Sequence, residues 1–148
     1  MKSKELIILF LILVLGFSCK STKKATEIST TDETNCIEMD LLNQALEGLP
    51  ADPFQIDSLV LENHCLNIYV NYGGGCGEAE FQLYYTQIVT QSMPPQTTLH
   101  LSFKDEDPCR LFVTKKLTYN LEPFVELANN GGVYLLIGEK RILFEIEE

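Results

Sequence analysis

The chain has 148 residues, of which 45% are hydrophobic and 22% are charged, a composition typical of one globular domain. Its formal net charge is −10, from 21 acidic and 11 basic residues. A surface this acidic repels phosphate groups, so the composition argues against a nucleic-acid-binding protein.

Residues 1–18 have the features of a bacterial signal peptide. Two lysines precede an apolar run over residues 6–17, which is short for a membrane-spanning helix. The segment 15–19, Leu-Gly-Phe-Ser-Cys, resembles the lipobox of bacterial lipoproteins. The resemblance implies cleavage before Cys19, lipidation of this cysteine, and anchoring to the inner or outer membrane of the cell envelope, facing the periplasm or the surface. The alternative is an ordinary leader that happens to contain a cysteine.

Residues 19–34 are polar and rich in serine and threonine, with Ile28 as their one large apolar side chain. Such a segment buries too little apolar surface to offset the entropy that ordering costs. We therefore expect a flexible tether from the lipidated Cys19, followed by a single β-rich domain over residues 35–148.

The first element of this domain is expected to be a short N-terminal helix over residues 36–49. Asn35 is a candidate N-cap with Glu38 three positions later, and Gly48 followed by Pro50 supplies the stop. Its apolar residues recur at helical spacing and are expected to face the core. They are Ile37, Leu41, Leu42, Ala45, Leu46 and Leu49.

The strongest strand signal is the stretch 65–85, where two alternating runs flank a glycine-rich turn. We expect a β-hairpin with Tyr72 opposite Gly77 and residues 73–76 as its loop, because this register puts both apolar sets on one face. These apolar residues are Leu66, Ile68, Val70, Tyr72, Phe81, Leu83 and Tyr85. The loop is not a nucleotide-binding loop, because no Gly-Lys-Ser/Thr and no helix follow it.

The remaining strands are expected at residues 56–62, 97–103, 111–121, 133–137 and 142–146. Pairing of apolar residues puts Phe103 opposite Leu83, and the last two strands form a second hairpin. The acidic loop 105–107 is expected to be solvated. Together these elements predict a mainly β protein, an antiparallel β-sandwich with the helix packed against it. The alternative is an α+β fold with one antiparallel sheet covered by the helix.

Four cysteines lie in the expected domain, and an even number in an exported chain indicates disulfides. If the hairpin forms, Cys65 lies roughly 23 Å from the loop that carries Cys76, too far for a bridge. The same strand alignment brings Cys76 and Cys109 to one end of the sheet, which leaves Cys36 for Cys65. We therefore favour the bridges Cys76–Cys109 and Cys36–Cys65.

An alternative use of these thiols is a metal or redox site that includes His64 and His100. The expected strands separate both histidines from the cysteines, and no Cys-x-x-Cys is present. We accordingly expect no metal and no cofactor.

The sequence shows no catalytic motif such as Gly-x-Ser-x-Gly or His-Glu-x-x-His, so we expect no enzyme. The favoured function is a lipid-anchored binding or interaction module whose partner, besides the membrane, is an envelope protein or a glycan. Tyr69 and Tyr84, on the outward face of the expected hairpin, are candidate contacts for a sugar or a partner protein, and the favoured alternative is that they pack against the second sheet layer or the helix. The alternative is a metal-binding or thiol-linked envelope stress protein.

Four short motifs resemble those of a family of small bacterial lipoproteins of unknown function. The motifs, between residues 61 and 121, are Tyr72-Gly73-Gly74-Gly75-Cys76, Phe81-Gln82-Leu83, Pro94-Pro95 and Asp107-Pro108-Cys109. Where that family often has a histidine three residues after the loop cysteine, this chain has Ala79. The resemblance implies an exported protein with a shared fold, and it implies no activity.

Overall fold

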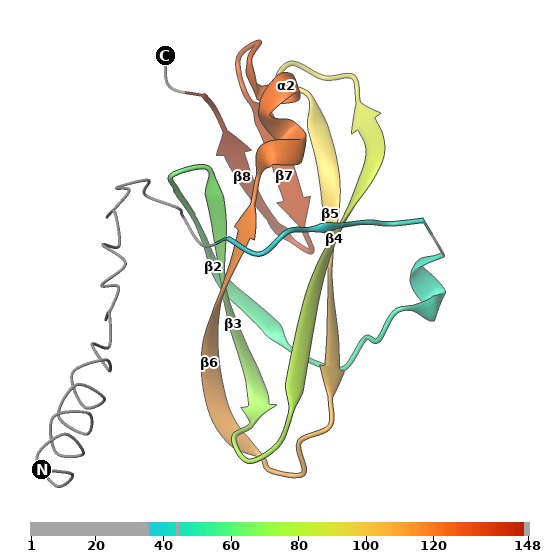
Figure 1. Ribbon diagram of the computed structural model, residues 1–148, viewed down its shortest axis with the longest axis vertical. Helices are drawn as coiled ribbons and strands as arrows, with labels where there is room; N and C mark the ends of the chain where they lie inside the picture. The colour runs from blue at the N-terminus through green and yellow to red at the C-terminus, as the bar shows by residue number, and fades with distance from the viewer. Residues whose placement is uncertain (1–35, 44, 147–148) are drawn as a thin grey trace, which may run out of the picture. The chain divides into compact units, whose positions relative to one another are not determined.

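The computed structural model describes residues 36–43 and 45–146, which form two β-sheets (Figure 1). One sheet has the strand order β1-β4-β5-β7-β8 and the other β2-β3-β6. The strands are β1 (Asp40–Leu41), β2 (Gln55–Glu62), β3 (Cys65–Gly74), β4 (Ala79–Thr90), β5 (Gln96–Asp105), β6 (Leu111–Asn120), β7 (Val133–Ile137) and β8 (Lys140–Phe144). The predicted mainly β fold is confirmed, whereas the signal peptide, Cys19 and the whole of the predicted tether lie outside the described residues.

The expected hairpin between β3 and β4 is wrong. β3 pairs with β2 and β6, whereas β4 pairs with β1 and β5, so the connection between β3 and β4 crosses from one sheet to the other. The predicted apolar faces nevertheless point inward, since Leu66, Ile68, Val70 and Leu83 are all 0% exposed. They meet across the core between two sheets rather than on one face of a single sheet.

The pairing of β4 with β5 is antiparallel as expected, but its register differs by two residues. Phe103 lies opposite Phe81, and Leu83 lies opposite Leu101. A shift of two keeps every side chain on its face, so the inward set is unchanged. The Phe81 and Phe103 rings stack with centroids 4.2 Å apart, and Tyr72 of β3 packs edge-on against both from the other sheet.

The N-terminal helix expected over residues 36–49 is also wrong, because this segment is largely extended. Residues 36–43 and 45–54, which we call the strap, pass from one sheet edge to the next (Figure 1). Ile37 hydrogen-bonds to the edge of β6, β1 pairs in parallel with β4, and Pro50 and Asp52 hydrogen-bond to Phe103 of β5. Edge strands present unpaired N–H and C=O groups, and an extended segment satisfies them where a helix would not.

Short helical turns occur in two places among the described residues. η2 (Leu46–Gly48) lies in the strap, and η3 (Glu122–Phe124) continues into α2 (Val125–Ala128) between β6 and β7. No helix in the described part of the chain is long and apolar enough to cross a membrane.

The predicted C-terminal hairpin of β7 and β8 is confirmed. β7 also pairs in parallel with β5, and β1 pairs in parallel with β4, so the five-stranded sheet is mixed rather than purely antiparallel. The presence of two sheets excludes the alternative fold with a single sheet.

Candidate binding site

Two disulfides lie at opposite ends of β3. Cys36 is bonded to Cys65 at the start of β3, with their Cα atoms 6.1 Å apart, and Cys76 is bonded to Cys109 just beyond its end, with Cα atoms 5.9 Å apart. This is the pairing favoured from the sequence. Cys65 and Cys76 are too far apart to be bonded even though the predicted hairpin is absent, because β3 alone separates them.

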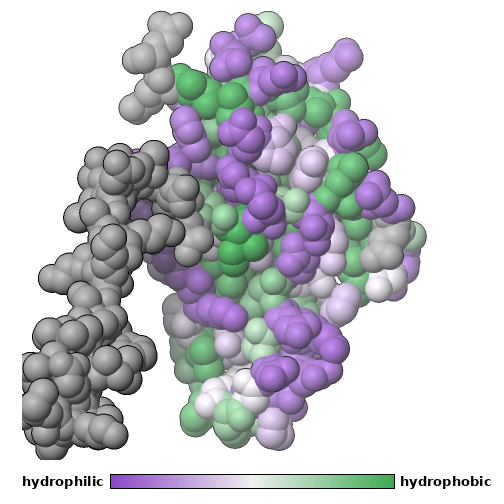
Figure 2. Space-filling view, viewed as in Figure 1, coloured by the Kyte–Doolittle hydropathy of each residue, from purple (hydrophilic) through white to green (hydrophobic). Residues whose placement is uncertain are grey.

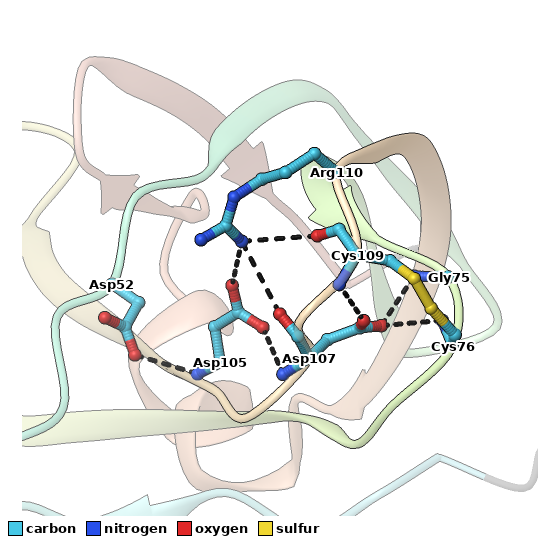
Figure 3. Close-up of polar contacts among 7 residues, drawn as sticks. All are labelled: Asp52, Gly75, Cys76, Asp105, Asp107, Cys109 and Arg110. Atoms are coloured by element: carbon cyan, nitrogen blue, oxygen red, sulfur yellow. Dashed lines mark hydrogen bonds and ion pairs between the residues drawn. A yellow bond between two sulfur atoms is a disulfide. The ribbon is translucent and has the colours of Figure 1, made fainter.

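The Cys76–Cys109 bridge joins the β3–β4 connection to the β5–β6 connection, and we call residues 75–77 and 107–109 the linked end (Figure 3). Within it, the Asp107 carboxylate accepts backbone N–H groups from both connections. Its Oδ2 lies 2.6 Å from the nitrogen of Gly75 and 2.9 Å from that of Cys76, and its Oδ1 lies 2.8 Å from that of Cys109. The two loops are therefore held together by a covalent bond and by charge-assisted hydrogen bonds.

Asp107 is only 5% exposed, so the expectation of a solvated acidic loop is wrong at this residue. Burial by itself would raise the pKa of Asp107. The backbone N–H groups of Cys109, Gly77, Cys76 and Gly75 outweigh this effect and lower the pKa to about 2. Gly77 must be glycine here, because a Cβ atom at this position would lie 2.8 Å from the Asp107 Cα.

A metal site is not supported by these residues. Cys76, Asp107 and Cys109 bring ligand atoms within 4.8 Å of one another, the one such group in the described ranges. Both sulfurs are bonded to each other, however, and the carboxylate already accepts three N–H groups. Thiolate ligation would require reduction of the disulfide.

The two histidines and the two candidate tyrosines are not brought together. His64 lies in the turn between β2 and β3, with its ring against Phe144, and His100 lies on β5 opposite Tyr84. Tyr69 is on β3, in the other sheet from Tyr84, so the expected outward pair of tyrosines does not form.

A pocket of about 390 Å³ lies beside the linked end, and we call it the Gly73 pocket. Gly73 of β3 is paired with Phe112 of β6, and a Cβ atom on Gly73 would lie 3.9 Å from the Cδ of Arg110. Arg110 and Phe112 thus flank a position that has no side chain. Asn71 and Gln55, which are paired across β3 and β2, continue the lining.

The charge of the Gly73 pocket comes from Arg110, whose side chain is 78% exposed. Its Nη1 contacts the carbonyl oxygens of Asp107 at 3.5 Å and Cys109 at 3.2 Å, and the Asp105 carboxylate at 3.7 Å (Figure 3). These contacts orient the guanidinium group through one nitrogen. Among the described residues that line the pocket, Arg110 is the one charged side chain, and its positive charge is partly balanced by Asp105 beside it.

Phe112 is 78% exposed and the neighbouring Leu111 is 65% exposed. Figure 2 shows hydrophobic side chains on the surface toward the end of the domain that carries the β3–β4 and β5–β6 connections. The sequence analysis missed Phe112, although a signal was present. Residues 111–113 are all apolar, and in a strand that alternates, one of three consecutive apolar residues must point away from the core.

A larger cavity of about 580 Å³ lies between the strap and the outer face of the five-stranded sheet, with His100 and Leu136 in its wall. Asn43 and Ala45 are in the wall of this cavity, and residue 44 between them lies outside the described residues. We place the candidate site at the Gly73 pocket, because all of its lining is described.

The chain is thus a two-sheet β protein with one disulfide-linked end and the Gly73 pocket beside it. No protein-family model and no curated protein match the sequence. Among solved structures, it is similar to a protein of unknown function, DUF1344, from Bacteroides vulgatus, with 12% identity, a TM-score of 0.51, and coverage of 75% of this chain and 56% of that one. It is also similar to a NigD-like immunity protein from Bacteroides caccae, with 15% identity, a TM-score of 0.51, and coverage of 74% and 58%.

These two likenesses show the fold alone, because both identities are low. The chain spans between half and two thirds of the length of each neighbour. The fold is thus shared with small bacterial proteins, one of them of unknown function.

Proposed function

We propose that the protein is a lipid-anchored, non-catalytic binding module of the bacterial cell envelope, and that the Gly73 pocket is its contact site. The observation that carries the proposal is the exposed Phe112 and Arg110 beside an end of the domain that is held by the Cys76–Cys109 bridge and by Asp107.

Rigidity at the linked end favours binding. Ordering a mobile loop on association costs free energy, and loops that are already ordered avoid this cost. Aromatic and arginine side chains are also the residue types enriched in the contacts that contribute most to protein binding, and both types stand exposed here.

The composition of the Gly73 pocket supports a non-catalytic role. The lining residues that carry polar side-chain groups are Arg110, Asn71, Gln55 and Tyr72. Burial and the nearby charges of Asp107 and Asp105 raise the pKa of Tyr72, so this hydroxyl remains protonated at neutral pH. The pocket therefore lacks a carboxylate or imidazole that would act as a general base.

The placement of the pocket suits an anchored protein. The chain enters the described domain at Cys36, which is bonded to the start of β3, whereas the pocket lies at the end of the same ten-residue strand. At about 3.3 Å per residue, these points are about 30 Å apart. The pocket therefore lies at the end of β3 away from Cys36, where the described part of the chain begins.

Anchoring is tested by metabolic labelling with a radiolabelled or alkyne fatty acid in a bacterial host. We expect label on the wild-type protein in the membrane fraction and no label on Cys19→Ala. A Cys19→Ala protein that is labelled as strongly as the wild type would contradict the proposal.

Contact through the pocket is tested with a photo-crosslinking amino acid in place of Phe112, in the full chain in whole cells. The matched control places the same amino acid at Ile88, which is 77% exposed on β4. We expect a discrete adduct from position 112 that does not form from position 88. The absence of an adduct, or the same adduct from both positions, would contradict the proposed site.

A further inference from the structure

We infer that the Gly73 pocket binds an acidic sugar unit of a glycan, with the sugar ring on Phe112 and its carboxylate on Arg110. The inference rests on the proposed function and names the ligand class for the same site. Three features of the pocket carry the inference: the exposed ring beside the missing side chain at Gly73, the amides, and the guanidinium group.

The first feature is a flat apolar surface with open space beside it. Phe112 is 78% exposed, and its partner across the two strands is Gly73, which has no side chain of its own and is bordered by the Arg110 stem. The C–H face of a pyranose ring is apolar and packs on aromatic rings, while its hydroxyls stay at the periphery. An open sheet surface beside an aromatic ring accommodates this shape.

The second feature is a pair of amide groups at the side of this space. The hydroxyl of Thr114 donates to the Asn71 Oδ1 at 2.8 Å, so the Asn71 side chain is held in place. The Asn71 Nδ2 and the whole amide of Gln55 have no hydrogen-bond partner within the described part of the chain. Amides offer both donors and acceptors, which matches the hydroxyls of a sugar.

The third feature is the charge. Arg110 uses Nη1 for its contacts with the linked end, which leaves Nη2 and Nε without a partner among the described residues (Figure 3). A guanidinium group presents parallel N–H donors that match a carboxylate. Asp105 is paired with Nη1 alone, and no carboxylate is among the described residues of the lining, so a negatively charged ligand group matches the remaining donors.

The shape of the pocket favours a sugar over a peptide. A peptide side chain that anchors a complex is typically inserted into a closed apolar pocket, whereas the Gly73 pocket is bordered by the exposed Arg110 and Phe112 and includes Asn71 and Gln55 in its lining. A peptide strand added to β6, along the part of its edge that Ile37 does not cover, would use the backbone of that strand instead of the space beside Gly73. The two modes are separated by the variants below.

The test uses the full chain purified in detergent, with trigalacturonate as the acidic probe, the neutral trisaccharide maltotriose and the peptide hexaglutamate as comparison ligands. Binding is measured by calorimetry and by saturation-transfer NMR at physiological ionic strength. We expect trigalacturonate to bind at least about tenfold more tightly than either comparison ligand. Saturation transfer should reach the ring C–H protons of the sugar.

Three variants locate the site. Arg110→Gln and Phe112→Ala should each weaken trigalacturonate binding about tenfold or more. Gly73→Val should abolish it by filling the space, and it should fold, because its Cβ meets the Arg110 stem at an ordinary contact distance of 3.9 Å. Lys116→Gln is the matched control, since it removes a positive charge from the same strand away from the pocket and should leave affinity unchanged.

Equal affinity for the hexaglutamate peptide, equal affinity for maltotriose, or an equal loss in Lys116→Gln would overturn the inference. So would a lack of trigalacturonate binding by a folded wild-type protein. If trigalacturonate does not bind but the photo-crosslinking residue at position 112 still forms a discrete adduct in cells, the inferred ligand class is wrong and the proposed binding site is retained. If the adduct is also missing, the proposed function fails with it.

Discussion

The carboxylate of Asp107 accepts the backbone N–H of Gly75 at 2.6 Å, from a position 32 residues further along the chain. Gly75 follows a strand of the three-stranded sheet, whereas Asp107 follows a strand of the five-stranded sheet. The hydrogen bond therefore joins the two layers at the same end as the Cys76–Cys109 bridge. Because the loop glycines supply N–H donors without side chains, a single carboxylate collects several of them.

Replacement of Asp107 by asparagine should loosen the linked end. An asparagine has one acceptor oxygen in place of two, and its NH₂ group would face a backbone N–H. We expect a lower thermal midpoint and about tenfold faster hydrogen exchange of the Gly75, Cys76 and Cys109 amides. Glu106→Gln, the same kind of change at an exposed neighbour, is the control and should leave these amides unchanged.

The same carboxylate makes a specific contribution to the pH dependence of stability. Its pKa is about 2 in the folded protein, compared with an ordinary value of 3.8. The stability contributed by this group is therefore fully present above pH 3.8 and is lost as the pH falls through about 2. Urea denaturation of wild type and Asp107→Asn across this range should give a difference that shrinks toward low pH. A difference that stays constant from neutral pH to pH 2 would show that the charge of Asp107 is unimportant.

Removal of either disulfide should lower the free energy of unfolding by about 3 kcal/mol, chiefly because the unfolded chain gains freedom. The bridges span 29 and 33 residues, so their effects should be similar. The measurement is urea denaturation of the double serine variants at Cys36 and Cys65 and at Cys76 and Cys109.

The two double variants should differ in where the folded protein loosens. Loss of the Cys36–Cys65 bridge should speed exchange of the Ile37 amide, which donates to Thr118 at 2.8 Å. Loss of the Cys76–Cys109 bridge should affect Gly75 and Cys76 instead. Identical exchange changes in both variants would contradict the separation of the two ends.

Tyr119 provides a test of the core. Burial raises the pKa of its hydroxyl to about 12, and the hydroxyl donates to the carbonyl oxygen of Phe81 in the facing sheet at 3.4 Å. The difference between alkaline absorbance titrations of wild type and Tyr119→Phe should show one step near pH 12. The stability that comes from this buried phenol is present below pH 10 and is lost as the pH rises through about 12.

The loss of the hydroxyl itself should cost about 1 kcal/mol, since one neutral hydrogen bond is removed and the ring is kept. A titration step near pH 10 in the difference curve would mean that Tyr119 is accessible to water and that the two sheets do not close over it.

The candidate site could not be predicted from the sequence as a whole, although parts of it were visible. The apolar triplet at 111–113 already implied an outward apolar side chain. Its partner Gly73 lies about forty residues earlier, and the two meet only because β3 pairs with β6. The predicted hairpin paired β3 with β4 instead of β6. It therefore did not bring Arg110 next to Asn71 and Gly73.

Alternation of apolar residues along each strand determined which side chains point inward, because a period of two sets the buried face whatever the partner strand is. The amino-acid pattern also predicted which cysteines are bonded, because the length of the strand that follows Cys65 keeps Cys65 and Cys76 too far apart for a bridge. The tertiary structure alone decided the pairing of strands, since Ile68 and Leu83 share one interior equally well as neighbours in a sheet or as facing residues across two sheets. The tertiary structure also decided that residues 36–49, which have an apolar pattern typical of a helix, are largely extended. Unpaired backbone groups of β4, β5 and β6 bond to the strap, and no local pattern in the sequence predicts these partners.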